Sequence, residues 1–242
     1  MYVHIDKRRK LPVTTLLRAI GISTNHDLRK IFYEKEVLKL KDAKGRHLYA
    51  DIIVPDIPEP VAFANDQLND NLITILDAHG IKEVELISYD YEIARKVLEN
   101  TMAKDPTYNQ EDALKKIYSL IRPGEEASVE ISKQLIDRMF FNEKRYNLGE
   151  VGRYKINTRL GLEVDESIRT LTVEDFVYIF KTLINIYNDE DDIDDIDNLS
   201  NRRVRTVGEL LQEQYNTGLA MVSRIIQERM AISNPDEITV HD

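Results

Sequence analysis

An abrupt reversal of charge near the C-terminal end most constrains how this chain can fold. Seven of the nine residues from Asp189 to Asp197 are acidic, and the basic segment Asn201-Arg202-Arg203-Val204-Arg205 follows within a few residues. Like charges at this density repel one another, and no helical or strand period runs through them, so Asp189 to Asp195 is predicted to be an exposed loop. The simplest interpretation is a charged surface loop followed by the start of a helix, because surface ion pairs are common and weak.

Composition places the chain among globular proteins. Its 242 residues are 42% hydrophobic, which is ample for the core of one large domain or two small ones. It has no apolar run near the ~20 residues of a membrane span, and its first residues lack the apolar core of a signal peptide, so we expect a cytoplasmic protein without a membrane partner. The absence of cysteine excludes disulfides and thiolate zinc sites. A net charge of -10 argues against an overall basic surface, although a local basic patch can still bind nucleic acid.

Helical periodicity dominates, and the predicted fold class is a predominantly helical α+β protein. Helices are expected over residues 12–21, 24–32, 66–78, 92–102, 110–121, 128–141, 171–187 and 207–230. The last is a long amphipathic helix with apolar residues at steps of three or four, from Val207 to Met230. Thr24 and Thr172 are suited to cap the helices that they precede.

Residues of about 33–88 have a different character and look like a small mixed α/β insertion in a helical chain. Val37–Leu40 and Leu48–Val54 are predicted strands on either side of a turn, and prolines break the chain after the second. The helix over Asp66–Ala78 and the alternating strand Glu83–Ile87 complete the unit.

Two further segments have features of phosphate sites. The basic cluster Lys7–Lys10 is either four solvated side chains or a patch that faces phosphates, and the residues alone do not separate these alternatives. The glycines of Arg145–Lys155 lack the Gly-Lys-Ser/Thr ending of a Walker loop and the third glycine of a dinucleotide fingerprint. We therefore predict a turn that leads into a short helix.

No catalytic or metal constellation emerges from the motifs. The five histidines are scattered without ligand-like spacing, which makes zinc chemistry a poor fit. Counting a calcium loop from Asp192 places Asp197 where glycine is required and Arg203 where the bidentate glutamate belongs. There is no nucleophile elbow and no cysteine nucleophile. From its motifs the chain is not a self-sufficient enzyme, and no catalytic residue or metal ligand is assigned.

Four stretches resemble the bacterial DNA-directed RNA polymerase β subunit. They are DKRRKLPVTTLLRAIG at 6–21, IRPGE at 121–125, FFNEKRYNLGEVGRYKINTRLGL at 140–162, and the segment 192–230 with DDID, NRRVRTVGELL and QY..GL. The last is the most specific, because no single structural rule demands its residues. The insertion matches no constant part of the family and lies where lineages carry insertions of differing length.

The resemblance implies that residues 1–190 form the lobe of the subunit and that 191–242 return to the neighbouring protrusion, together making one wall of the downstream DNA cleft. It implies that Ile196, Asp197 and Arg202 belong to a pocket for a nontemplate-strand base. Arg203 and Arg205 are expected to contact phosphates or to pair internally, with internal pairing favoured for one of them. The implied partners are DNA and the β′, α and σ subunits, with transcription regulators at the insertion.

The resemblance also has gaps. Asn198 and Ser200 stand where the family usually has His and Gly, and Asn216 and Met221 stand where it often has arginine. These differences weaken the expected positive surface. The resemblance further implies a fragment that is inactive alone, since the magnesium of the nucleotidyltransferase is bound by β′ and this fragment holds no cofactor.

An alternative from another class is a helical protein-interaction scaffold. In it the acidic loop and the insertion recruit regulators, and no nucleic acid is bound. Phosphate contacts weaken as salt rises, so salt-dependent binding to forked DNA separates the two hypotheses.

Overall fold

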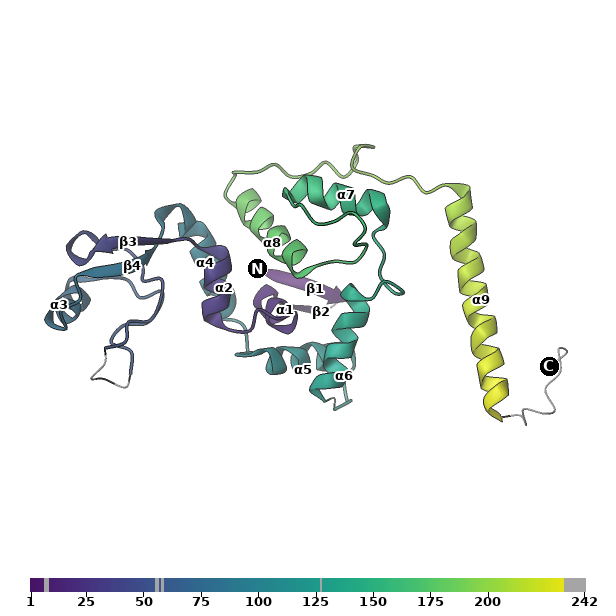
Figure 1. The fold of residues 1–242 in the computed structure, drawn as a ribbon, viewed down its shortest axis with the longest axis horizontal. Coiled ribbons are helices and arrows are strands. Elements are labelled where there is room, and N and C mark those ends of the chain that lie inside the picture. The colour runs from purple at the N-terminus through teal and green to yellow at the C-terminus, as the bar shows by residue number, and fades with distance from the viewer. Residues whose placement is uncertain (7–8, 55–56, 58, 127, 233–242) are drawn as a thin grey trace. The chain divides into compact units, whose positions relative to one another are not determined.

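The structure is a computed structural model that describes residues 1–6, 9–54, 57, 59–126 and 128–232 (Figure 1). The chain divides into two compact units, Met1–Asp192 and Ile193–Asp242. Helices predominate and the only named strands of the described residues form two small sheets, so the predicted α+β class is confirmed. None of the described helices is long and apolar enough to cross a membrane.

The first unit is mainly helical. Its helices are α1 (Val13–Ala19), α2 (Asn25–Phe32), α3 (Asp70–Ala78), α4 (Glu92–Met102), α5 (Gln110–Ile121), α6 (Val129–Ile136), α7 (Gly149–Leu160) and α8 (Val173–Tyr187). The apolar faces of α1, α2, α4, α5 and α8 pack into one core that includes Leu17, Leu28, Ile117 and Phe180. Burial of these side chains provides the main driving force for folding.

The predicted helix starts follow from side-chain caps. Thr24 and Asp27 form a reciprocal capping box at α2, and Thr172 and Asp175 form another at α8. Each box satisfies backbone N–H groups that have no partner inside the helix. The predicted helix over 128–141 differs in its last turn, since α6 ends at Ile136 and a π-helical turn, η3 (Asp137–Phe141), follows it.

An N-terminal hairpin was not predicted from the sequence. Strands β1 (Tyr2–Asp6) and β2 (Arg9–Pro12) pair in antiparallel register. Of the basic cluster, Lys7 and Arg8 lie outside the described residues. Lys10 lies on β2 with its ammonium 5.2 Å from the ring centroid of Tyr2, an arrangement that favours a cation–π contact.

The α/β insertion has a core of its own. Strands β3 (Lys35–Lys39) and β4 (Glu83–Ile87) are antiparallel, and η1 (Leu40–Asp42) and α3 lie beside them. Among the residues that the structure describes, eight buried ones form this second cluster, including Leu48, Leu76 and Leu86. The cluster is separate from the main helical core, so the insertion is a small structural module.

Two predictions inside the insertion were wrong. Residues 48–54 do not form a strand, because Leu48 bridges to β4 whereas Ile52 bridges to Ala62. The change of partner within four residues prevents a continuous ladder. Helix α3 begins at Asp70 and not at residue 66, because the Asn69 side chain accepts a hydrogen bond from the Leu72 amide and caps it there.

The second unit contains the predicted C-terminal helix, α9 (Val207–Ile232). Its apolar residues include Leu211, Tyr215, Leu219 and Val222, each more than half exposed. None of the described side chains of α9 is buried. The prediction of a loose tail beyond Ser233 falls outside the described residues.

Candidate nucleic-acid interface

Successive turns organise the chain between Asp195 and Arg202. The carboxylate of Asp195 accepts from the Asp197 amide at 3.0 Å, and the Asn198 side chain accepts from the Ser200 amide at 3.0 Å. The Asn201 side chain then donates to the carbonyl of Asp195 at 3.1 Å. Asp and Asn side chains commonly close turns in this way. The last bond ties the two ends of the turn together and brings Asp197 and Arg202 into one local structure.

The three residues of the predicted base pocket lie on this turn and are exposed. The side chain of Ile196 is 78% accessible, and Asp197 and Arg202 are exposed as well. Within the part of the chain that the structure describes, no side-chain hydrogen bond or ion pair engages the Asp197 carboxylate or the Arg202 guanidinium. An apolar side chain, an acceptor and a fork of donors are therefore available to a partner.

Arg203 and Arg205 are both paired within the second unit. Arg203 contacts the Glu209 carboxylate at 2.5 Å, and Arg205 contacts Glu213 at 2.6 Å. Internal pairing was favoured for only one of the two, and the structure pairs both. Pairs as exposed as these contribute about 0–1 kcal/mol, so either guanidinium can exchange its carboxylate for a phosphate at little cost.

The predicted acidic loop is exposed, and one of its residues is held in place. The Asp191 carboxylate accepts from Arg159 of α7 at 2.9 Å, and Arg159 also donates to the Asp192 carbonyl at 3.1 Å. The Arg159 hydrogen bond is the main cause that lowers the pKa of Asp191 below its usual value. The loop is thereby fastened to the helical unit before the chain enters the turn at Asp195.

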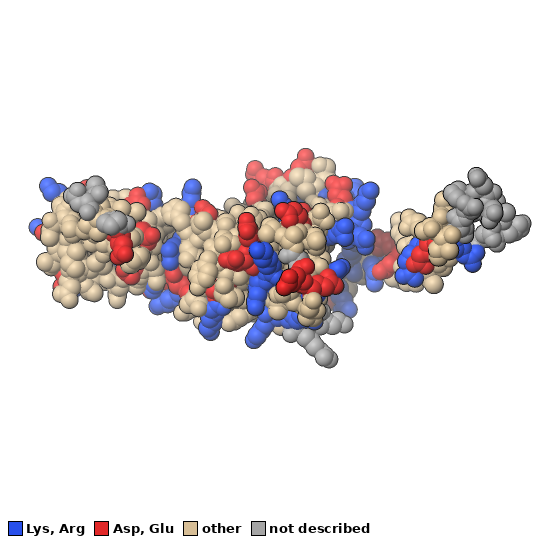
Figure 2. Space-filling view, turned by 90° about the horizontal axis from the view of Figure 1, so that it is seen from below, with Lys and Arg blue, Asp and Glu red and all other residues tan. Residues whose placement is uncertain are grey.

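Positively and negatively charged side chains are mixed on the surface of the protein. Figure 2 shows Lys and Arg side chains interspersed with Asp and Glu side chains over the visible face. A continuous basic surface is absent from this face, in keeping with the net charge of -10. Contacts to nucleic acid would then rest on a few placed side chains. No group of three or more His, Asp or Glu among the described residues is arranged to hold a metal ion.

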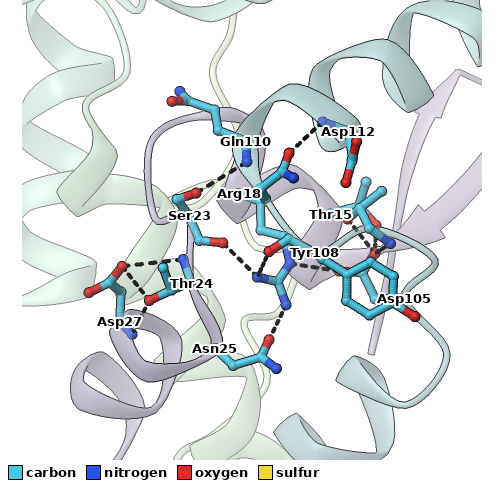
Figure 3. Close-up of polar contacts among 12 residues, drawn as sticks. Thr15, Arg18, Ser23, Thr24, Asn25, Asp27, Asp105, Tyr108, Gln110 and Asp112 are labelled. Atoms are coloured by element: carbon cyan, nitrogen blue, oxygen red, sulfur yellow. Dashed lines mark hydrogen bonds and ion pairs between the residues drawn. The ribbon is translucent and has the colours of Figure 1, made fainter.

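A buried arginine network, which sequence analysis missed, fixes α1 against the segment between α4 and α5 (Figure 3). Arg18 donates to the Asp105 carboxylate at 3.3 Å, and Thr15 donates to the same carboxylate at 2.8 Å. Arg18 also donates to the Ser23 carbonyl at 2.6 Å and to the Asn25 side chain. The Arg18 side chain is 2% exposed and that of Asp105 is 0% exposed, so the network is structural and not a surface for ligands.

A second buried arginine joins α7 to α8. Arg153 contacts both carboxylate oxygens of Asp175, at 2.7 and 2.9 Å, and both side chains are 0% exposed. Its remaining donors reach the carbonyls of Ile168 and Thr170. Asp175 also closes the capping box with Thr172, and that carboxylate could have been suspected from the Thr-x-x-Asp spacing. The sequence carries no comparable signal for Arg153.

Comparison with known proteins decides the family. Residues 71–205 match the family described as RNA polymerase Rpb2, domain 2, and this range is more than half of the chain and contains all five predicted DNA-contacting residues. The chain belongs to this family. The matched range also extends from within the α/β insertion to the arginines that precede α9, so it includes both helices α4 to α8 and the turn at 195–202.

Relatives with curated names give the same assignment. A DNA-directed RNA polymerase subunit beta of Flavobacterium psychrophilum is 40% identical over an alignment that covers the whole chain and 21% of the relative. Proteins of the same name from Phocaeicola vulgatus and Porphyromonas cangingivalis are 39% and 38% identical, with the same coverage. The chain thus spans about a fifth of the length of the curated relatives that it matches.

Proposed function

We propose that this chain is part of the β subunit of a DNA-directed RNA polymerase, the nucleotidyltransferase that transcribes DNA into RNA from ribonucleoside triphosphates. The observation that carries the proposal is the Rpb2 domain 2 match over 71–205, supported by relatives of that name aligned over the whole chain. On this proposal the chain works in the cytoplasm within an assembly of β′, α and σ subunits. The catalytic magnesium is held by β′, and no residue of this chain takes part in bond making.

Within that assembly, residues 1–190 are assigned to the lobe and 191–242 to the segment that returns to the protrusion, forming one wall of the downstream DNA cleft. The exposed apolar face of α9 supports the second assignment. Leu211, Leu219 and Ile226 are each at least half exposed, and an amphipathic helix of this length is normally stabilised by packing. Other parts of a longer subunit would supply that packing. The α/β insertion is assigned to contacts with transcription regulators.

The turn at 195–202 is assigned to the nontemplate strand of DNA. The Asp197 carboxylate is suited to accept hydrogen bonds from the N–H groups of guanine, while Ile196 offers an apolar contact to an unstacked base. The Arg202 guanidinium provides planar donors for the base or its phosphate. Arg203 and Arg205 lie next in the chain and can reach phosphates by releasing Glu209 and Glu213.

The test is Asp197→Ala in the polymerase assembled from complete subunits. A good base contact is worth about 1–3 kcal/mol, so preference for guanine over other nontemplate bases is expected to fall by about 5- to 150-fold. Transcription complexes with single-base changes in the unpaired nontemplate strand provide the measurement. Asp192→Ala is the matched control, since it removes another exposed carboxylate five residues away. Unchanged base preference in Asp197→Ala would remove the assigned role.

A second measurement concerns Arg202. Arg202→Ala is expected to weaken binding of the polymerase to forked DNA. Arg202→Lys keeps the positive charge but lacks the planar set of N–H donors of the guanidinium. If Arg202 contacts a phosphate, the slope of log affinity against log salt falls by about 1 in Arg202→Ala. A salt slope and base preference that both match the unmodified polymerase would exclude Arg202 from the interface.

A further inference from the structure

A groove lies within the first unit, away from the turn at 195–202. It has a volume of about 330 Å³ and is formed by the end of α2, the 3-10 turn η2 (Tyr89–Tyr91), the start of α4 and the C-terminal half of α8. Its lining includes the apolar residues Phe32, Ala94 and Ile184 and the charged residues Asp90, Lys181 and Glu190. Of these, Phe32, Ala94 and Ile184 are buried core residues and provide an apolar floor.

One rim of the groove is built by the C-terminal cap of α8. Asp189 has a left-handed backbone with φ of 57°, and its amide donates to the Ile186 carbonyl at 3.2 Å. The Glu190 amide donates to the Asn185 carbonyl at 2.9 Å, and the Asn188 side chain donates to the Glu190 carboxylate. These paired bonds are the Schellman arrangement, here with aspartate at the position where glycine is usual. Glu190 is therefore held at the groove by backbone and side-chain hydrogen bonds.

The electrostatics of the groove favour a cation. The C-terminus of α8 contributes the negative end of a helix dipole, and the acidic residues Asp90 and Glu190 are both part of the lining. The lining ammonium, Lys181, lies 5.4 Å from the ring centroid of Tyr178 on its own helix. Burial lowers the pKa of Lys181, and the charge of Glu34 opposes that shift. Phosphate groups would meet two carboxylates and the helix terminus, so nucleic acid is a poor fit.

We propose that this groove binds a polypeptide segment that presents an arginine beside an apolar side chain. The aliphatic stem of the arginine would cover the floor at Phe32 and Ile184, and its guanidinium would lie between Asp90 and Glu190. Arginine suits the site better than lysine, because its planar group donates to two acceptors at once and its stem packs on apolar surface. The proposal goes beyond the DNA contact assigned above, since no residue of the turn at 195–202 lines the groove.

The test uses the 242-residue chain labelled with ¹⁵N and the capped peptide acetyl-Leu-Arg-Leu-amide. Titration is expected to shift the amide resonances of residues 90–94, 181 and 184–190, and the shifts should weaken as salt rises. Peptides with glutamate in place of arginine, or with glycine in place of both leucines, are the ligand controls. Equal shifts with the glutamate peptide, or no shifts at these amides, would overturn the proposal.

Variants of the chain make the test specific. Combining Asp90→Asn with Glu190→Gln is expected to weaken binding of the arginine peptide about tenfold, because two charge-assisted contacts are lost. Glu143→Gln removes an exposed carboxylate that does not line the groove and should leave binding unchanged. Asn185→Asp adds a carboxylate at an exposed lining position and should tighten binding several-fold. If the double variant binds the arginine peptide as tightly as the unmodified chain, the proposed site is wrong. This outcome is decisive even if Asn185→Asp fails to fold.

Discussion

Arginine–carboxylate pairs occur in both units of the chain, and they serve different purposes. In the first unit, Arg153 and Asp175 are 0% exposed and every donor that is described on Arg153 has an acceptor. In the second unit, the side chains of Arg205 and Glu213 are 55% and 57% exposed. Removing one partner of a buried pair leaves the other charge unpaired in a medium of low polarity. At the surface, water replaces the lost partner.

Burial therefore separates the arginines that hold the fold together from those that are available to the DNA partner proposed above. A buried arginine holds two helices together and cannot leave its partner without unfolding cost. An exposed one, such as Arg203, can exchange Glu209 for a phosphate. A graded series of substitutions tests whether burial alone sets these roles.

The largest expected effect is that of Asp175→Ala. The change leaves the Arg153 guanidinium buried without its carboxylate and also opens the capping box of α8, so we expect a loss of about 3–5 kcal/mol in the free energy of unfolding. Urea unfolding of the chain followed by tyrosine near-UV circular dichroism provides the measurement. Glu174→Ala, an exposed neighbour in the same helical turn, is the control and should stay within about 0.5 kcal/mol. An equal loss in the free energy of unfolding for the two variants would contradict the difference proposed between buried and exposed carboxylates.

The next effect is that of Asp105→Asn, which keeps the shape of the side chain but removes its charge beside Arg18. A loss of about 1.5–3 kcal/mol at neutral pH is expected. Burial by itself would raise the pKa of Asp105, but hydrogen bonds, first that from Thr107 and also that from Thr15, outweigh it and hold the pKa below its usual 3.8.

This lowered pKa gives the substitution a pH signature. A carboxyl group with a depressed folded-state pKa contributes stability above its unfolded value and loses it as the pH falls through the folded value. The unmodified chain should therefore lose part of its stability on going below about pH 3.8. Asp105→Asn should show a shallower dependence over that range in urea unfolding. If the stability of the unmodified chain and that of Asp105→Asn change in the same way with pH, ionisation of Asp105 does not contribute to stability.

An intermediate case is Arg159→Ala, since the side chains of Arg159 and Asp191 are each 32% exposed. The substitution releases the Asp191 carboxylate and the Asp192 carbonyl, so the loop after Glu190 should open more often. Cleavage after Glu190 by a glutamate-specific protease is expected to become several-fold faster, while the urea midpoint of the helical unit changes little. An unaltered cleavage rate would mean that Arg159 does not fasten the loop.

The smallest effects are expected for Arg203→Gln and Arg205→Gln. Each should change the stability of the chain by no more than about 0.5 kcal/mol, because the lost pairs are exposed. In the assembled polymerase the same variants should reduce the salt dependence of DNA binding if the arginines reach phosphates. A large loss of stability in either variant would show that the exposed pairs contribute as much as the buried ones. The distinction between buried and exposed arginine–carboxylate pairs would then be refuted.

Local patterns predicted much of the fold. The helices predicted over 92–102, 110–121 and 207–230 and the strand predicted over 83–87 are present, because they follow from periodicity, which depends only on neighbouring residues. The strand expected over 48–54 failed because its hydrogen-bond partners come from two different segments. The hairpin of β1 and β2 was missed, since the basic cluster Lys7–Lys10 interrupts any alternation of apolar and polar residues in the sequence there.

The sequence by itself determined the helical character, the helix caps, the exposure of the acidic loop and the resemblance that points to Ile196, Asp197 and Arg202. These depend on local spacing and on motif order, both of which are visible in one dimension. Only the tertiary structure decided which arginines are buried. Arg18 meets Asp105 across 87 residues, Arg153 meets Asp175 across 22, and Arg159 meets Asp191 across 32. Such distances in sequence carry no periodic signal, because packing of the helices brings the partners together.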